Sequence, residues 1–335
     1  MIEVRNLTKR YGAHTAIKGI TFSIDQGEII GFLGPNGAGK TTTMNIITGY
    51  IAPTEGEVKL DGIDITEEPE RAKRNIGYLP DTPPVYGDMR VSEYLGFVAD
   101  IKKVKKGRRE MIEEIMEEVN IAGMGKRLIK NLSRGYRQRV GLAQAMVGWP
   151  KLIIMDEPTI GLDPKQIIEM REVVKRLGKK HTVILSSHIM QEVSAVCDRV
   201  LIINQGSIVA SGTPLGLSGK LKAAGGLQVV VRGRKNRVLE ALEKFPQIAK
   251  AEANDGRESG TTELLVFAED GVDIREVVFR CMSENNLPIF LMKPNELSLE
   301  EIFLSITSGD VVFAGQDEDA VDEQGKEDIL DAGDV

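Results

Sequence analysis

The residue types best suited to chemistry form a glycine-rich stretch near the N-terminus, Gly34-Pro35-Asn36-Gly37-Ala38-Gly39-Lys40-Thr41, which is followed by Thr42. Glycines let a backbone turn tightly enough for its N–H groups to face phosphate oxygens. In such a turn Lys40 neutralises the β- and γ-phosphates, which makes it a binding and a catalytic candidate, while Thr41 binds Mg²⁺ and Thr42 can reach the α-phosphate. A surface turn is the alternative, but this stretch lies between an apolar run and a helical segment, where phosphate-binding loops lie. It therefore predicts a nucleotide site.

Two carboxylates, Asp156 and Glu157, end the apolar run at residues 152–155. Hard cations prefer oxygen ligands, so Asp156 joins Thr41 as a candidate ligand of Mg²⁺, directly or through water. Glu157 stands one residue further on, where it can accept a proton from an attacking water. Two acids at the end of a strand are more often an ordinary strand-to-loop transition. The glycine-rich turn reverses that preference and indicates a catalytic pair.

A candidate third motif, Leu132-Ser133-Arg134-Gly135-Tyr136, opens a helical segment; its serine lies 24 residues before Glu157. It resembles the signature motif of ABC-type ATPases, usually LSGGQ, with Arg134 and Tyr136 in place of a glycine and the glutamine. By itself, a serine at this place is more often the N-cap of an ordinary amphipathic helix. The interpretation therefore depends on whether other positions of the chain match the same family.

Three further positions do match it. Asp163, in Gly161-Leu162-Asp163-Pro164, resembles the acid of the family's D-loop, and His188 resembles the switch histidine at a strand end. Tyr11 matches the aromatic residue that stacks on adenine. A lone histidine is usually structural, and a lone tyrosine is usually a surface or packing residue. Five motifs in the family's order over residues 1–214 identify the chain, by resemblance, as a member of the ABC ATPase family.

The resemblance implies a mechanism that uses ATP, Mg²⁺ and two subunits. In the family, the signature of one copy meets the γ-phosphate of ATP held by another copy. Ser133, Gly135 and Asp163 are therefore expected to complete the ATP site of a second ATPase subunit, in a homodimer. Glu157 is the expected base for in-line attack by water, and His188 is expected to contact the γ-phosphate.

One position departs from the family pattern. The Q-loop glutamine is expected after the strand at residues 76–80, and the chain has Asp81 there. An ionised aspartate only accepts hydrogen bonds, whereas glutamine also donates them. Asp81 is therefore a candidate for the Mg²⁺ shell, but the glutamine's role does not transfer to it. An acid at this position, together with the signature motif at residues 132–136, resembles the pattern of the ATPase subunits of ABC-2-type exporters of the drug-resistance and gliding-motility kind.

Elements that position these residues alternate between strand and helix up to about residue 214. Near-continuous apolar runs, typical of strands buried on both faces, occur at residues 28–33, 151–155 and 182–185. Helical segments are expected at residues 40–48, 135–147, 164–177 and 189–196. This alternation predicts an α/β fold with a mostly parallel sheet, and the resemblance implies a P-loop NTPase of the ABC ATPase kind. An antiparallel β subdomain is expected from strands at residues 2–7 and 20–24, and a helical subdomain at about 82–148.

The pattern restarts after residue 216, where the ABC ATPase domain, residues 1–216, is expected to end. Residues 222–308 show the order βαββαβ, which predicts a small ferredoxin-like α+β domain. Ser298-Leu299-Glu300-Glu301 has the pattern of a helix start, and this extension also resembles the ABC-2 exporter subgroup. Residues 309–335 are acidic with few large apolar side chains, so we expect a disordered tail.

Composition limits the class of protein. The 335 residues are 41% hydrophobic and 28% charged, which excludes a disordered or fibrous chain. Residues 316–335 hold nine acids and one lysine, a net charge of −8, so the rest is near +1 within a total of −7. A neutral body gives no reason to expect nucleic acid binding. Cys197 and Cys281 cannot form a disulfide framework or a four-ligand zinc site.

The expected partners depend on the resemblance and on the absence of long apolar runs. The longest such runs are strand-sized and the N-terminus has no signal-peptide pattern, so we expect no membrane span. A transporter subunit of this kind needs integral membrane permease subunits of the ABC-2 kind and a peripheral place on the cytoplasmic face of the membrane. Residues 82–95 are the expected docking segment, with a plain surface loop as the alternative. The basic run at residues 102–109 is expected to be solvated, with contact to anionic lipid heads as the alternative.

A soluble ABC ATPase without a transport role is the competing class. Repair proteins of that class insert long coiled coils, but only 52 positions separate Asp81 from Ser133. Translation factors usually carry two cassettes, and this chain has one, whereas an iron–sulfur assembly role is harder to exclude. A P-loop kinase does not explain the signature, Asp163 and His188 together.

Overall fold

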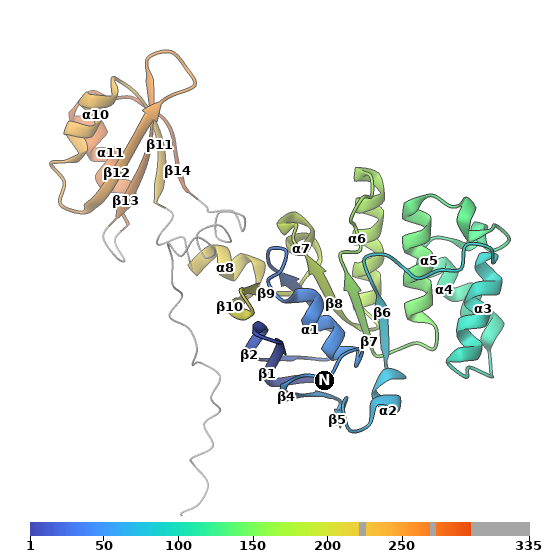
Figure 1. Ribbon diagram of the computed structural model, residues 1–335. Helices are drawn as coiled ribbons and strands as arrows, with labels where there is room; N and C mark the ends of the chain where they lie inside the picture. The colour runs from blue at the N-terminus through green and yellow to red at the C-terminus, as the bar shows by residue number, and fades with distance from the viewer. Residues whose placement is uncertain (221–225, 269–272, 296–335) are drawn as a thin grey trace, which may run out of the picture.

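Three β-sheets organise the part of the chain that the computed structural model describes, which is residues 1–220, 226–268 and 273–295. The first is a four-stranded antiparallel sheet, the second a six-stranded central sheet and the third a four-stranded sheet. Figure 1 shows the third sheet, with two helices, beyond the helix α8 (Pro214–Lys220). The predicted α/β fold with a mostly parallel sheet is confirmed.

The central sheet carries the candidate site at the ends of its strands. Its order is β10-β9-β3-β8-β7-β6, and all neighbours are parallel except β10 and β9. Every residue of β3, β7 and β8 is buried, which explains their apolar sequences. The strands are β3 (Ile29–Leu33), β6 (Ile76–Leu79), β7 (Leu152–Asp156), β8 (Thr182–Ser187), β9 (Arg199–Asn204) and β10 (Ser207–Gly212).

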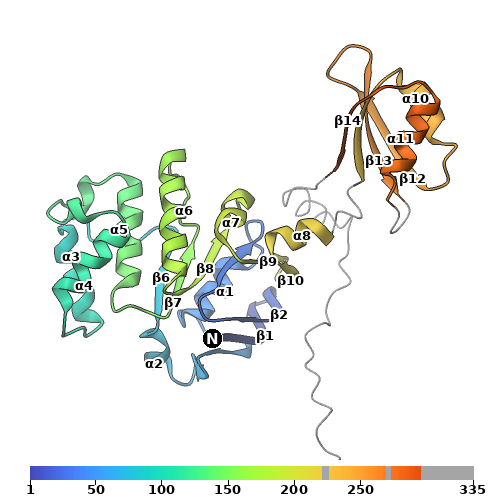
Figure 2. The same ribbon diagram turned by 180° about the vertical axis from the view of Figure 1, so that it is seen from behind.

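Both faces of the central sheet are covered (Figure 2). On one face pack α5 (Arg134–Met146), α6 (Pro164–Gly178) and α7 (Met190–Val196), in a core with strand residues such as Met155. On the other face pack α1 (Lys40–Ile47) and the antiparallel sheet. Because apolar contacts occupy both faces, the carboxyl ends of the strands are the place left for a ligand.

The antiparallel sheet, of order β2-β1-β4-β5, is longer than the sequence pattern suggests. Its strands are β1 (Ile2–Tyr11), β2 (His14–Ile24), β4 (Glu55–Leu60) and β5 (Ile63–Asp64), and α2 (Pro69–Lys73) comes next in the chain. The predicted segments 2–7 and 20–24 hold the buried apolar residues of β1 and β2 except Ile17. The outer half of the hairpin, which ends at the pair Tyr11 and His14, is mostly exposed and polar, so its sequence carries little alternation.

The segment of the chain that connects β6 to β7 forms a separate layer of helices. They are α3 (Val91–Ile101), α4 (Arg108–Glu118), the short 3₁₀ helices η1 (Ala122–Met124) and η2 (Ile129–Asn131), and α5. The basic run at residues 102–109 joins α3 to α4, and the expectation that it is solvated is wrong for Lys102. Lys102 donates to the backbone oxygens of Ala145 (3.3 Å) and Val147 (2.7 Å), and Arg108 binds Asp100. Both side chains fasten the loop to neighbouring helices.

The third sheet has the predicted βαββαβ order and its own core. Its elements are β11 (Leu227–Arg232), α10 (Lys235–Leu242), β12 (Ile248–Asp255), β13 (Thr261–Ala268), α11 (Arg275–Glu284) and β14 (Ile289–Pro294), with sheet order β12-β13-β11-β14. Val229, Leu264 and Met282 belong to its buried core. The predicted helix start at Ser298 and the predicted tail, residues 309–335, lie outside the described residues.

Candidate active site

Lys40 is the first residue of α1 and lies after β3, where the glycine-rich turn joins the two elements. Its ammonium donates hydrogen bonds to the backbone oxygens of Gly34 (2.6 Å) and Pro35 (3.3 Å). Burial lowers the pKa of Lys40 below its ordinary value, and Glu157 and Asp156 act in the opposite direction. The backbone of the turn thus surrounds a buried cation, which suits an anionic ligand.

Gly34 and Gly39 are required by close approaches of the backbone. A Cβ at Gly34 would lie 2.3 Å from the backbone oxygen of Ile203, and one at Gly39 would lie 2.9 Å from that of Ala16. The N-cap residue of α1, Gly39, has no side chain with which to cap the helix. The N–H groups of its first turn and the helix dipole are therefore available to a bound anion. The rest of the turn consists of Pro35, Asn36, Gly37 and Ala38.

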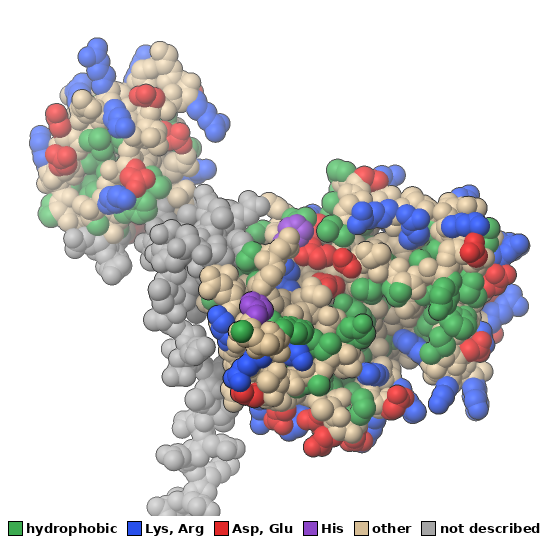
Figure 3. Space-filling view, in the orientation of Figure 1, with side chains coloured by type: hydrophobic (Ala, Val, Ile, Leu, Met, Phe, Trp, Pro, Cys, Tyr) green, Lys and Arg blue, Asp and Glu red, His purple; other side chains and the backbone are tan. Residues whose placement is uncertain are grey.

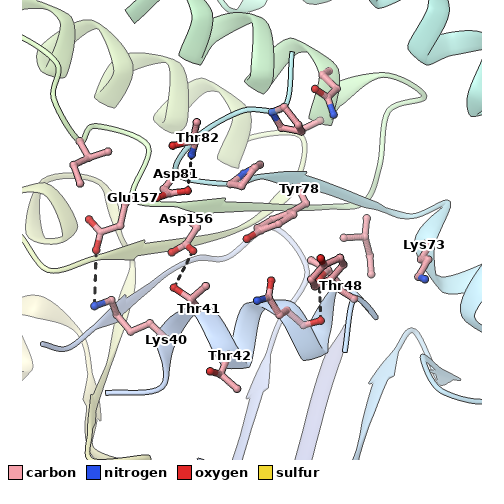
Figure 4. Close-up of a pocket in the computed structure, with 18 of the residues that line it drawn as sticks. Lys40, Thr41, Thr42, Thr48, Lys73, Tyr78, Asp81, Thr82, Asp156 and Glu157 are labelled. Carbon is pink, nitrogen blue, oxygen red and sulfur yellow. Dashed lines mark hydrogen bonds and ion pairs between the residues drawn. The ribbon is translucent and has the colours of Figure 1, made fainter. Parts of the chain in front are cut away.

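Asp156 ends β7 beside the first turn of α1, as Figure 4 shows. Thr41 donates a hydrogen bond to Oδ2 of Asp156 at 3.0 Å, and Ser186, the residue before the last one of β8, donates to Oδ1. Two hard oxygen groups from different elements therefore lie together. No group of three or more His, Cys, Asp or Glu that could hold a metal occurs within residues 1–220, 226–268 and 273–295. The hydroxyl of Thr41 and the carboxylate of Asp156 instead fit Mg²⁺, which takes one or two protein ligands and completes its shell with water and substrate phosphates.

Glu157 lies between Lys40 and His188. Its Oε1 is 3.8 Å from Nζ of Lys40, and its Oε2 is 2.8 Å from Nδ1 of His188. The backbone of Glu157 has a φ of 48°, in the left-handed region that non-glycine residues rarely adopt. Its N–H donates to the oxygen of Ser186 at 3.0 Å. The chain therefore turns sharply out of β7 and presents this carboxylate to a cleft that residues of the glycine-rich turn also line.

Asp81 lies just after β6 and lines the same cleft (Figure 4). Its Oδ1 accepts a hydrogen bond from the N–H of Thr82 at 2.6 Å. Burial raises the pKa of the Tyr78 hydroxyl above its ordinary value, and the negative charges of Asp156 and Asp81 both add to that effect. Two carboxylates thus act on one phenol at this end of the cleft.

The cleft has a volume of about 1440 Å³ and extends from the glycine-rich turn to α3 and α5. This is larger than the about 300–1,000 Å³ typical of small-molecule sites. Tyr11 lines it with a half-exposed ring, 5.3 Å from the ammonium of Lys9, and Thr42 lines it too. A second part of the cleft, the aromatic lobe, is lined by Pro84, Tyr86, Tyr94, Phe97 and Ile101. Figure 3 shows hydrophobic side chains gathered over the helical layer, with Lys and Arg along its outer edge.

Ser133, Gly135 and Asp163 lie outside this cleft. Ser133 is the N-cap of α5, where its Oγ accepts from the N–H of Tyr136 at 3.4 Å. Asp163 is the N-cap of α6, where its Oδ1 accepts from the N–H of Gln166 at 2.9 Å. A Cβ at Gly135 would lie 2.5 Å from the side chain of Gln166. The structure thus brings these three residues near one another, and away from the glycine-rich turn of the same chain.

Two residues close to the site were not predicted from the sequence. Ser186 binds Asp156, and Glu192, in the first turn of α7, is buried and binds Thr159, which follows β7, and Ser187, the last residue of β8. A serine ending an apolar run was a usable signal for Ser186, because such a side chain lies at the strand end. An acid in a first helical turn is ordinary, so no sequence pattern indicates that Glu192 is buried.

These observations define the class of protein. A buried lysine and a helix N-terminus can hold the phosphates of a nucleoside triphosphate. A hydroxyl and carboxylate pair can hold a hard cation, and a glutamate beside a histidine can take a proton from water. The fold and the site together are those of a P-loop nucleotide hydrolase.

Comparison with known proteins narrows the class. The family model for ABC transporter domains matches residues 17–160. The linearmycin resistance ATP-binding protein LnrL of Bacillus subtilis (strain 168) is 32% identical over 317 residues, which are 92% of this chain and 98% of LnrL. The bacitracin transport ATP-binding protein BcrA of Bacillus licheniformis is 37% identical over 211 residues, which are 62% of this chain and 68% of BcrA.

Solved structures agree with the sequence relatives. The ATP-binding subunit of an ABC transporter has a TM-score of 0.60 and 29% identity, over 66% of this chain and 93% of that one. A dimeric ATP-binding cassette in a post-hydrolysis state, bound to ADP and Pi, has a TM-score of 0.58 and 26% identity, over 64% of this chain and 98% of that one. The chain belongs to the ABC transporter family, as an ATP-binding subunit that hydrolyses ATP. In the described part of the chain, no helix has both the length and the apolar character needed to cross a bilayer.

Proposed function

We propose that this chain powers an exporter of the ABC-2 kind, as one of two identical ATPase subunits that work with separately encoded membrane permease subunits. The names of LnrL and BcrA, which refer to linearmycin resistance and bacitracin transport, favour export. Asp81 at the Q-loop position supports the same subgroup. The near-neutral charge outside the C-terminal tail argues against a nucleic acid partner.

The observation that carries the proposed chemistry is the contact of Glu157 with both Lys40 and His188. The carboxylate of Glu157, whose side chain is only 14% exposed, lies beside the ammonium of Lys40 and the imidazole of His188. Both of these groups are suited to the γ-phosphate. In the proposed reaction Lys40 and the N–H groups of the turn hold the phosphates, Glu157 accepts the proton of the attacking water, and His188 contacts the γ-phosphate. The ring of Tyr11 is the proposed support for adenine.

Thr41 and Asp156 are the residues proposed to hold Mg²⁺, which neutralises phosphate charge when bound. Their hydroxyl and carboxylate lie 3.0 Å apart, and Ser186 fixes the second oxygen of Asp156. Asp81 is proposed to act on the outer shell of the ion, because it lies at the same end of the cleft. Its shorter side chain accepts hydrogen bonds only, so it cannot replace every contact of a glutamine.

The second subunit is proposed to complete the ATP site with its own Ser133, Gly135 and Asp163. Within one chain these residues lie outside the cleft, and Ser133 stands at the N-terminus of α5, an end suited to an anionic phosphate. A dimer is therefore the simplest assembly in which all the predicted site residues meet one nucleotide.

The permease subunits are proposed to dock at the aromatic lobe of the cleft, on the cytoplasmic face of the membrane. Tyr86, Phe97 and Ile101 are large exposed hydrophobic side chains there, and the predicted docking segment, residues 82–95, supplies Tyr86. We further propose the division into an ATPase domain at residues 1–216, an accessory domain at residues 222–308 and a tail at residues 309–335.

The proposed chemistry is tested with Glu157→Gln. Loss of the base should lower the rate of ATP hydrolysis by about 100-fold or more while ATP binding is retained. The variant should also accumulate as an ATP-bound dimer, which size-exclusion chromatography with ATP detects. The measurements are the phosphate release rate, the affinity for ATP and the elution volume of the full-length chain.

Two further variants serve as controls for that experiment. Lys40→Ala should lose ATP binding, because a cation for the phosphates is removed. Glu172→Gln, at an exposed carboxylate on α6, should behave as the wild type. Hydrolysis at the wild-type rate in Glu157→Gln would contradict the assignment of the base, and retained affinity in Lys40→Ala would contradict the assignment of the phosphate site. Co-purification with an integral membrane protein tests the transport role.

A further inference from the structure

Glu192 is a buried carboxylate for which the proposed reaction has no use. It lies in the first turn of α7 and is 3% exposed. Its Oε2 accepts a hydrogen bond from the hydroxyl of Thr159, and a second from the hydroxyl of Ser187 at 3.2 Å. The same Ser187 oxygen accepts from the N–H of Ile189 at 3.0 Å. Burying a carboxylate is costly unless it is hydrogen-bonded, so these two hydroxyls are what makes the position tolerable.

One hydroxyl belongs to the loop that carries Glu157, and the other belongs to the strand residue directly before His188. Thr159 lies two residues beyond Glu157, along the turn after β7. Ser187 ends β8 and directly precedes His188. One carboxylate oxygen therefore joins the two segments at a point outside the cleft. The segments that carry Glu157 and His188 are thus connected twice: by the 2.8 Å contact between these two side chains, and by the hydrogen bonds of Thr159 and Ser187 to Glu192.

We propose that Glu192 is a positioning residue for ATP hydrolysis, which holds the Glu157 loop and the His188 loop together so that base and imidazole keep their geometry. The inference rests on the roles proposed above for those two residues. A displacement of about 1 Å in a reacting group can lower a rate by about 100-fold. The proposed phosphate site lies on other parts of the chain, the glycine-rich turn after β3 and the start of α1, so affinity for ATP should depend on Glu192 much less than turnover does.

Two further buried atoms distinguish this position from ordinary packing. Oε1 of Glu192 and Nε of Arg171, on α6, have no hydrogen-bond partner among the described residues, and both side chains border one cavity. The cavity measures about 10 Å³, about the size of a single water. A hydrophobic side chain of similar volume would fill the site and leave no polar oxygen without a partner. The unpaired Oε1 therefore costs stability here, which favours a role in the reaction.

A purely structural role is the alternative, because α7 also packs on the core through Met190, Val193 and Val196. The two roles differ in what they change. Loss of a structural contact lowers the melting temperature and loosens nucleotide binding together with activity. Loss of a positioning contact lowers kcat while the affinity for nucleotide is kept.

The test compares Glu192→Ala, Glu192→Gln and Thr159→Val in the full-length chain, with Glu172→Ala as the matched control at an exposed carboxylate. The measurements are kcat and KM for ATP hydrolysis, the binding affinity for ATP, and the melting temperature. Glu192→Ala should lower kcat by about tenfold or more, with KM and affinity within about threefold of the wild type. Glutamine keeps an oxygen that accepts from both hydroxyls, so Glu192→Gln should recover most of the rate. Thr159→Val, which removes one donor, should lie between the two.

Several outcomes would overturn the proposal. These are a wild-type kcat in Glu192→Ala, an equal loss of kcat in Glu192→Gln and Glu192→Ala, and a loss of affinity in proportion to kcat. If Glu192→Ala does not fold, Thr159→Val decides, because a folded Thr159→Val chain with normal kcat would also overturn it. Glu157→Gln is measured alongside to separate the two proposals. Normal hydrolysis in Glu157→Gln removes the proposed base but leaves the Glu192 comparison valid.

Discussion

At the scale of single residues, Glu157 combines an unusual backbone with two charged or titratable partners. Its φ of 48° stores local strain, which proteins keep mainly where function requires a particular direction of a side chain. Lys40 and His188 contact opposite oxygens of its carboxylate. Any movement of this loop therefore changes the surroundings of the proposed phosphate-binding cation and of an imidazole at once, which is why its anchoring matters.

His181 carries a prediction about pH and stability. It is buried, its Nδ1 lies 2.7 Å from the backbone oxygen of Pro150, and its Nε2 has no hydrogen-bond partner in the described part of the chain. The ring stacks on Trp149 at 6.0 Å. Burial lowers the pKa of His181 below its ordinary value. The folded state therefore holds the neutral ring at a pH where the unfolded chain is already protonated.

That difference sets the sign of the pH effect. Below the unfolded pKa of about 6.5, the unfolded state binds more protons at this site, so the free energy of unfolding should fall as the pH decreases. His181→Gln removes the titration and should flatten this part of the profile. Urea unfolding from pH 8 to pH 5 measures it, with His14→Gln, at an exposed histidine, as the control. An unchanged slope in His181→Gln would contradict the prediction.

At the scale of elements, Lys102 ties the loop after α3 to the carboxyl end of α5, the helix that begins at Ser133. Its ammonium donates to the oxygens of Ala145 and Val147, and burial lowers its pKa to about 8. Lys102→Met should lower the free energy of unfolding by about 1–3 kcal/mol, since two backbone oxygens lose their donor. Urea unfolding at pH 7 measures it. Lys105→Met, at an exposed neighbour, should change stability little, and an equal loss in both variants would contradict the prediction.

How far the sequence predicts these elements depends on where their partners lie. Strands such as β7 and β8 are buried on both faces, so their own residues form recognisable apolar runs. The turn before α1 was predictable because Lys40 and its glycines act locally. The outer half of the hairpin of β1 and β2 was not, because exposed strand residues need no apolar alternation.

The other unpredicted parts are charged residues whose partners are distant in sequence. Lys102 looked solvated because its partners lie 43 and 45 residues away along the chain. Glu192 looked like an ordinary first-turn acid, since Thr159 lies 33 residues before it. Burial of such groups depends on tertiary packing, and residue type alone favours exposure for both.

At the scale of the whole molecule, the candidate residues form two groups on one chain. The first group, around Lys40 and Glu157, lines the cleft, and the second, around Ser133 and Asp163, caps two helices outside it. In the proposed head-to-tail dimer, the second group of each subunit meets the first group of the other, and the two-fold symmetry makes both sites alike. This arrangement can be tested without any structure of the dimer.

The test mixes two inactive variants, Lys40→Ala and Gly135→Asp. Lys40→Ala damages the cleft, and Gly135→Asp places a carboxylate at the N-terminus of α5, where it repels a phosphate. In a mixed dimer one site combines both defects and the other has none. An equal mixture should therefore recover at most about a quarter of the wild-type hydrolysis, because half of the dimers are mixed and each has one intact site. A mixture of Lys40→Ala with Glu157→Gln is the control. Each subunit then has a defect in its own cleft, so neither site of a mixed dimer is intact and the mixture should stay inactive. Recovery in that control, or none in the first mixture, would contradict a site shared between two subunits.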